Sequence, residues 1–215
     1  IRQKAVDWPG VDVEIEPVRD YPTGDMTANL IGFLGPIPAS NVDYYEQLGL
    51  VANRDKVGYA GIEASMQDAL AGTNGTRIVE RDVAGQILRN IEAPVAPKPG
   101  DDVYLTIDAR LQSAAEAALV GEIESWNRYY FGDTGEQRIS SGAAIAMNPK
   151  TGEILAMVQW PSYENNRMAR IIPAYYYNQL EQDPRHPLLN YAISAEYPPG
   201  SVYKISTATG ALNED

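Results

Sequence analysis

The part of the sequence that most constrains the fold is a pair of apolar runs, residues 142–147 and 153–159, joined by Asn148-Pro149-Lys150-Thr151-Gly152. Proline and glycine in so short a connection reverse the chain, so the pattern predicts an antiparallel β-hairpin. Both faces of each strand would be apolar, which is typical of a sheet that is covered on both sides. We therefore expect an antiparallel sheet flanked by helices.

A helix is expected shortly before this hairpin. Asp108 is a good N-cap, and an apolar face follows it at helical spacing. That face consists of Leu111, Ala115, Ala118, Leu119 and Ile123. The preceding residues 103–107 alternate in a strand-like way, so helices and strands are mixed along this part of the chain.

The first hundred residues are irregular and rich in turns. Residues 11–18 alternate apolar and polar side chains, which predicts a half-buried strand. Residues 61–70 predict a helix that Gly72 ends, and residues 72–79 suit a hairpin turn. Residues 94–100 contain three prolines and are the best linker candidate. We place the domain boundary there, with a partial N-terminal domain at 1–97 and a second domain at 98–215. The expected fold class is α+β.

Composition excludes several classes of function. The formal net charge of −12 disfavours nucleic acid as a partner, because phosphate binding needs a basic surface. No cysteine is present, so disulfides and thiol chemistry are excluded. The single histidine, His186, lies between prolines in a loop, which argues against a His-rich zinc site and favours a solvated side chain. We expect no cofactor.

The start of the chain, Ile1-Arg2-Gln3-Lys4, has no signal-peptide pattern, and no run is long enough to span a bilayer. We expect the sequence to be a piece of a longer protein whose targeting segment lies elsewhere.

The residues with a chemical pattern are Ser201 and Lys204. Pro198-Pro199-Gly200 cannot lie inside a helix, so the last helix must begin at about Ser201, with Lys204 one turn later. Helical residues three apart have Cβ atoms about 5–6 Å apart, and helical side chains tilt towards the N-terminus. A lysine so placed can take the proton of a serine nucleophile, and the helix N-terminus favours the negative charge of acyl transfer.

The motif S-x-x-K is weak by itself. A lysine with the ordinary pKa of about 10.4 is neutral only about once in a few thousand molecules at pH 7, so burial or a neighbouring cation must assist it. The alternative from the two residues alone is that Ser201 caps a helix and Lys204 is solvated.

The surrounding blocks decide between these interpretations. In chain order they are Arg19-Asp20-Tyr21-Pro22-Thr23-Gly24, Gly58-Tyr59-Ala60-Gly61-Ile62-Glu63 with Leu70-Ala71-Gly72 and Gly75, Leu105-Thr106-Ile107-Asp108-Ala109-Arg110-Leu111-Gln112, Asn148–Met157, Pro187-Leu188-Leu189-Asn190 and Pro199-Gly200-Ser201-Val202-Tyr203-Lys204. In type and order these blocks resemble those of class B penicillin-binding proteins, over nearly the whole chain. The spacing that leads into the second block is closer to elongation-type than to division-type members.

The resemblance implies an N-terminal pedestal followed by the first part of a serine D,D-transpeptidase domain. Ser201 would be the nucleophile and Lys204 the general base, and the Ser201 amide would donate to the oxyanion. The implied substrate is the D-Ala–D-Ala end of a peptidoglycan stem peptide, and β-lactams would acylate the same serine. Such proteins are anchored by one N-terminal helix on the extracytoplasmic face of the membrane and work with a lipid-II polymerase.

The sequence departs from the family pattern at several points. Tyr191 follows Asn190 where the family usually has arginine. Lys150-Thr151-Gly152 and Ser125-Trp126-Asn127 spell later active-site motifs, but both precede Ser201, so we interpret them as structural. No such motif follows Ser201, and we expect the 215-residue chain to be inactive alone.

Two other functions stay open. One is a non-catalytic interaction module of the cell-wall synthesis complex, because residues 1–97 contain no plausible catalytic group. The other is a β-lactamase or β-lactam sensor, since both share S-x-x-K, although the long segment before Leu105 argues against it.

Overall fold

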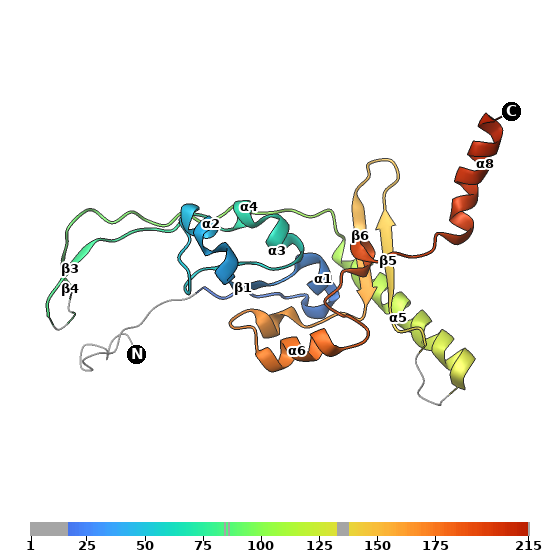
Figure 1. The fold of residues 1–215 in the computed structure, drawn as a ribbon, viewed down its shortest axis with the longest axis horizontal. Helices are drawn as coiled ribbons and strands as arrows, with labels where there is room; N and C mark the ends of the chain where they lie inside the picture. The colour runs from blue at the N-terminus through green and yellow to red at the C-terminus, as the bar shows by residue number, and fades with distance from the viewer. Residues whose placement is uncertain (1–16, 84, 86, 133–137, 215) are drawn as a thin grey trace.

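The computed structural model describes residues 17–83, 85, 87–132 and 138–214. The strand predicted for residues 11–18 lies largely outside this range. Helices and small antiparallel two-stranded sheets are mixed along the chain, which confirms the α+β class (Figure 1). None of the helices in the described ranges combines the length and the apolar character that crossing a membrane requires.

The α-helices are α1 (Ala28–Ile31), α2 (Val42–Gln47), α3 (Gly61–Ser65), α4 (Gln67–Leu70), α5 (Ala109–Phe131), α6 (Ala174–Gln182), α7 (Tyr191–Ser194) and α8 (Lys204–Asn213). Short 3-10 helices are η2 (Gly24–Thr27), η3 (Ala39–Asn41), η5 (Asn165–Met168) and η6 (Gly200–Tyr203). The strands are β1 (Leu34–Pro36), β2 (Lys56–Gly58), β3 (Val79–Arg81), β4 (Ile87–Asn90), β5 (Gly142–Met147) and β6 (Ile154–Trp160). Sequential strands pair antiparallel: β1 with β2, β3 with β4, and β5 with β6.

The predicted hairpin is β5–β6, and the predicted helix before it is α5. Asp108 caps α5 by accepting hydrogen bonds from the amides of Arg110 and Leu111. The helix packs on one face of the hairpin, where its Ile123 side chain is buried. The short helix α7 also contacts both strands. On the face away from α5, Ile145 and Met147 are 48% and 55% exposed, so the described residues cover that face only in part. Residues 103–107 form no strand, although the Thr106 hydroxyl donates to the carbonyl of Ile154 in β6.

Three predictions for the N-terminal half need correction. The helix expected over residues 61–70 is broken into α3 and α4 at Met66, whose backbone leaves helical geometry at φ −112° and ψ 22°. Residues 72–79 are not a turn but one leg of a long two-stranded arm, residues 73–98, that reverses between β3 and β4. Residues 94–100 are not a free linker, because Val95 and Lys98 pair with the outgoing leg of this arm. The domain boundary at residues 97 and 98 stays a prediction.

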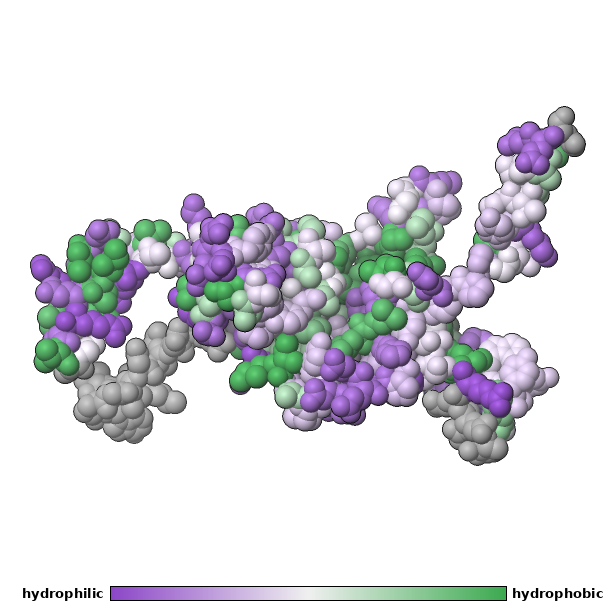
Figure 2. Space-filling model, viewed as in Figure 1, coloured by the Kyte–Doolittle hydropathy of each residue, from purple (hydrophilic) through white to green (hydrophobic). Residues whose placement is uncertain are grey.

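The arm extends away from the body of the molecule (Figure 1). Apolar and polar surface alternate along it in Figure 2. Its exposed apolar residues are Ile78, Val83, Ile87, Leu88, Ile91 and Val95. A two-stranded ribbon buries little apolar area, so the arm contributes little to the core.

The main core combines both halves of the sequence. It contains Ala28 and Phe33 from the N-terminal half, and Tyr163, Met168, Tyr176 and Leu180 from the segment after β6. The rings of Phe33 and Tyr163 meet edge to face with their centroids 5.9 Å apart. Neither half buries these side chains alone, so the chain before α5 and the chain after β6 form one packed unit.

Candidate active site

Ser201 and Lys204 lie on one helical turn. Gly200 has φ +56°, a conformation that glycine adopts without steric cost, and the 3-10 helix η6 begins there. The amide of Lys204 donates to the carbonyls of Ser201 and Val202, and the chain continues as α8. In a 3-10 turn the side chains of residues three apart eclipse each other. The structure thus confirms that the helix begins at about Ser201, and the spacing of the two residues predicts that their side chains project from the same side.

The pair is open to solvent. Ser201, Lys204 and the rest of α8 are exposed, and this helix projects away from the body in Figure 1. Within the described residues, neither side chain makes a hydrogen bond. A serine and a lysine on the same helical turn can carry out nucleophilic acyl transfer once burial or a neighbouring charge activates them.

Residues 189–191, which precede this pair in the chain, are held by several hydrogen bonds. Asn190 caps α7, because its side-chain oxygen accepts the amide of Ala192 at 3.2 Å. The Asn190 side-chain amide also donates to the carbonyl of Asn29 at 2.9 Å. The buried Gln159 of β6 donates to the carbonyl of Leu189 and accepts the amide of Tyr191, both at 2.8 Å.

Asn29 belongs to residues 25–32, which we call the junction segment. Five of its backbone carbonyls accept hydrogen bonds from side chains that lie far away in the sequence. The pairs are Ser162 to Asp25, Gln112 to Met26, Tyr163 to Ala28, Asn190 to Asn29 and Asn165 to Gly32, at distances of 2.7–3.1 Å. The junction segment therefore connects α5, the chain after β6 and the approach to Ser201.

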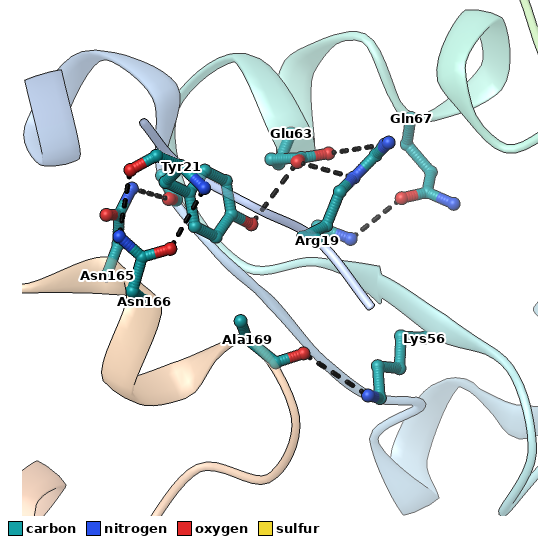
Figure 3. A network of polar contacts seen from close by, with 10 residues as sticks. Arg19, Tyr21, Lys56, Glu63, Gln67, Asn165, Asn166 and Ala169 are labelled. Atoms are coloured by element: carbon teal, nitrogen blue, oxygen red, sulfur yellow. Dashed lines mark hydrogen bonds and ion pairs between the residues drawn. The ribbon is translucent and has the colours of Figure 1, made fainter. Parts of the chain in front are cut away.

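A charged network lies next to the junction segment (Figure 3). Arg19 Nε lies 2.9 Å from Oε1 of the buried Glu63, and Tyr21 donates its hydroxyl to the same carboxylate oxygen at 3.3 Å. Burial raises the pKa of the Tyr21 hydroxyl, and the Glu63 carboxylate raises it further. Tyr21 also exchanges two backbone hydrogen bonds with the side-chain amide of Asn166, at 2.8 and 2.9 Å. Residues of the first predicted block thus fix the chain after β6.

The residues that we interpreted as structural have structural contacts. Thr151 donates to Glu153 within the β5–β6 turn, at 2.8 Å. Asn127 is buried on α5 and exchanges two hydrogen bonds with the backbone of Ile139. His186 is exposed in its loop. No cluster of three or more metal-binding side chains occurs among the residues that the structure describes.

The roles of Gln112, Gln159 and Asn165 were not predicted from the sequence. All three are buried amides whose partners are backbone groups of distant segments. The available signal was the presence of a polar side chain at an otherwise apolar position, as Gln159 is at the end of an apolar run.

Comparison with known proteins agrees with this arrangement. Residues 1–105 match the Penicillin-binding Protein dimerisation domain, and residues 142–215 match the Penicillin binding protein transpeptidase domain. The chain belongs to the penicillin-binding proteins, and specifically to class B.

Elongation-type proteins are among its curated relatives. The chain is 35% identical over 206 residues to peptidoglycan D,D-transpeptidase MrdA of Acinetobacter baumannii and 33% identical over 209 residues to MrdA of Escherichia coli. Each alignment covers 96% of this chain, but the chain spans only 28% and 30% of the length of these relatives. The predicted preference for elongation-type members is confirmed.

Solved structures show the same fold. The complex of penicillin-binding protein PBP2 with MreC from Helicobacter pylori matches 99% of this chain and 36% of that chain, with a TM-score of 0.75 and 25% identity. Pseudomonas aeruginosa PBP2 bound to WCK 5153 matches 91% of this chain and 35% of that chain, with a TM-score of 0.65 and 31% identity.

Proposed function

We propose that this chain carries the nucleophile of a peptidoglycan D,D-transpeptidase that cross-links the cell wall. The observation that supports the proposal is the placement of Ser201 and Lys204 on one turn at the start of a helix. The family assignment and the transpeptidase names of the relatives agree with it.

In the proposed reaction, the Ser201 hydroxyl attacks the carbonyl carbon between the two D-alanines of a stem peptide, and the Lys204 amine takes the hydroxyl proton. The carbon–nitrogen bond breaks, and the terminal D-alanine leaves with a proton. An amine of a neighbouring stem then attacks the acyl-serine ester and releases Ser201. The amide of Ser201, at the helix N-terminus, is placed to donate to the oxyanion. A β-lactam acylates the same oxygen when its ring amide opens.

The test uses a longer form of the protein that includes the later part of the transpeptidase domain. Incubation with a fluorescent penicillin should label it in a one-to-one ratio, and Ser201→Ala should abolish the label. Lys204→Met should slow labelling by at least a hundredfold, because a general base contributes about 10²–10⁴-fold. Ser206→Ala, on α8 but two residues beyond Lys204, is the matched control and should label normally. Labelling that persists in Ser201→Ala would refute the assignment, and rapid penicillin turnover would indicate a β-lactamase.

We also propose a second role, as an interaction module. The two-stranded arm presents exposed apolar side chains on a part of the chain without catalytic groups. The H. pylori relative was solved in complex with MreC, which makes a protein partner of this kind the best candidate. A lipid-II polymerase in the membrane is a further proposed partner, with the protein anchored on the extracytoplasmic face. Binding of purified partners to the 215-residue chain tests this role, and replacing Ile87 and Leu88 by serine should weaken binding if the arm is used.

A further inference from the structure

Two amide side chains hold the backbone immediately before α7. Gln159 Nε2 donates to the carbonyls of Leu189 at 2.8 Å and Pro161 at 3.3 Å, and Gln159 Oε1 accepts the amide of Tyr191 at 2.8 Å. Asn190 lies between Leu189 and Tyr191, the two residues that Gln159 holds, and its side-chain amide donates to the Asn29 carbonyl of the junction segment. Gln159 is only 7% exposed, so these bonds are protected from competition with water.

We call residues 189–191, with the side chains of Gln159 and Asn190 that hold them, the clamp. It is bonded to two separate parts of the molecule. Gln159 belongs to β6, in the hairpin of the transpeptidase domain, and Asn29 belongs to α1 in the N-terminal half. Asn190 and Asn29 are 161 residues apart in the sequence, and Tyr191 and Gln159 are 32 apart. The Tyr191 hydroxyl adds a third contact, a 2.8 Å hydrogen bond to the carbonyl of Arg185. Tyr191, which stands where the family usually has arginine, thus also holds residues 189–191 in place.

The connection from the clamp to the nucleophile is short and contains stiff parts. It consists of the single turn α7, residues 195–199 and the 3-10 helix η6. Pro198 and Pro199 each have φ fixed by the pyrrolidine ring, and proline also restricts the residue before it. These prolines reduce the conformational freedom of residues 197–199, so a change in the direction of α7 is carried in part towards Ser201.

We propose that Gln159 and Asn190 are positioning residues for Ser201, and that Asn190 couples the position of Ser201 to the N-terminal half through the Asn29 carbonyl. The inference rests on the proposed transpeptidase function. Neither side chain takes part in the chemistry. Both act by holding residues 189–191, from which the chain runs to the nucleophile.

The test compares two asparagines in matched roles. Asn190→Asp keeps the oxygen that caps α7 and removes the donor to Asn29. Asn166→Asp likewise keeps the oxygen that accepts the Tyr21 amide and removes the donor to the Tyr21 carbonyl. Both changes weaken contact with the N-terminal half, but only Asn190 lies on the path to Ser201. Gln159→Met removes the other anchor at similar side-chain length.

Acylation by a fluorescent penicillin is measured in the longer, transpeptidase-containing form, at several drug concentrations and together with the melting temperature. Asn190→Asp and Gln159→Met should lower the acylation rate constant at saturating drug about 10- to 100-fold, since small misplacements of reacting groups have effects of that size. The half-saturating concentration should change much less. Asn166→Asp should lower the melting temperature while the acylation rate stays at the parent value.

The outcomes separate the two proposals. A parent protein that is not labelled overturns the proposed function and this inference with it. A labelled parent with normal rates in folded Asn190→Asp and Gln159→Met overturns the positioning role alone. If Asn166→Asp slows acylation as strongly as Asn190→Asp, the effect is general destabilisation and the positioning role is again refuted. If Gln159→Met does not fold, the pair of asparagine variants decides.

Discussion

Replacing Gln112 by leucine tests whether α5, β6 and the junction segment are held together by one buried amide. Gln112 is fully buried. Its Nε2 donates to the carbonyls of Met157 at 2.8 Å and Met26 at 3.1 Å, and its Oε1 accepts the amide of Met157 at 2.8 Å. Leucine is of similar size but forms none of these three bonds.

The expected loss follows from these contacts. A net contribution of about 1 kcal/mol for each of three hydrogen bonds gives about 3 kcal/mol of unfolding free energy. The orphaned backbone groups of Met157 and Met26 would add to this loss, whereas the apolar leucine side chain would offset part of it. For a chain of this size, about 3 kcal/mol corresponds to a melting temperature lower by roughly 6–12 °C.

Urea unfolding followed by circular dichroism measures the difference. The control is Gln179→Leu on α6, an exposed glutamine whose replacement should change stability by less than about 0.5 kcal/mol. Gln112→Glu keeps an acceptor for the Met157 amide and loses the donor, so it should be destabilised as well. If Gln112→Leu is as stable as the parent protein, the three hydrogen bonds of Gln112 contribute nothing to the unfolding free energy. The idea that they hold α5, β6 and the junction segment together would then be refuted.

Three further predictions use other parts of the molecule. The 215-residue chain alone should not be labelled by a fluorescent penicillin, and one-to-one labelling at Ser201 would contradict this. Met168→Ala removes a fully buried core side chain and should lower the unfolding free energy by about 2–5 kcal/mol in urea unfolding, while Met66→Ala, at an exposed position, should have little effect. Burial and, to a smaller extent, Asp25 raise the pKa of the Glu116 carboxyl. At a pH above the ordinary pKa of glutamate, the ionised carboxyl is therefore less favourable in the folded state than in the unfolded state and lowers the stability. Glu116→Gln should therefore raise the melting temperature at pH 7 but not at pH 3.5, and the same shift at both values would refute that cause.

Local patterns predicted the parts of the fold that depend on near neighbours. The β5–β6 hairpin, the Asp108 cap and the helical turn that carries Ser201 each depend on residues within a few positions. The break of the helix at Met66 was missed because the apolar spacing continues through it while the backbone does not.

Contacts between distant segments could not be predicted in this way. The two legs of the arm pair through backbone groups, and the junction segment accepts five side-chain hydrogen bonds at its backbone carbonyls. Every residue has such backbone groups, so no sequence pattern marks the ones that are used. For the candidate site, the motif and the resemblance gave Ser201 and Lys204, whereas Gln159 became visible only through its partners in space.

The shared core has a consequence for the order of events during synthesis. The Ala28 carbonyl accepts its hydrogen bond from Tyr163, which follows it by 135 residues. At about 5–20 residues per second, a ribosome needs roughly 7–27 seconds to add that length. During this interval Phe33 has no aromatic partner from the later segment, and the nascent N-terminal half carries an open apolar surface. The region around Ala28 and Phe33 therefore completes its packing late, and a chaperone that shields it until translation has passed Leu180 should raise the yield of folded protein.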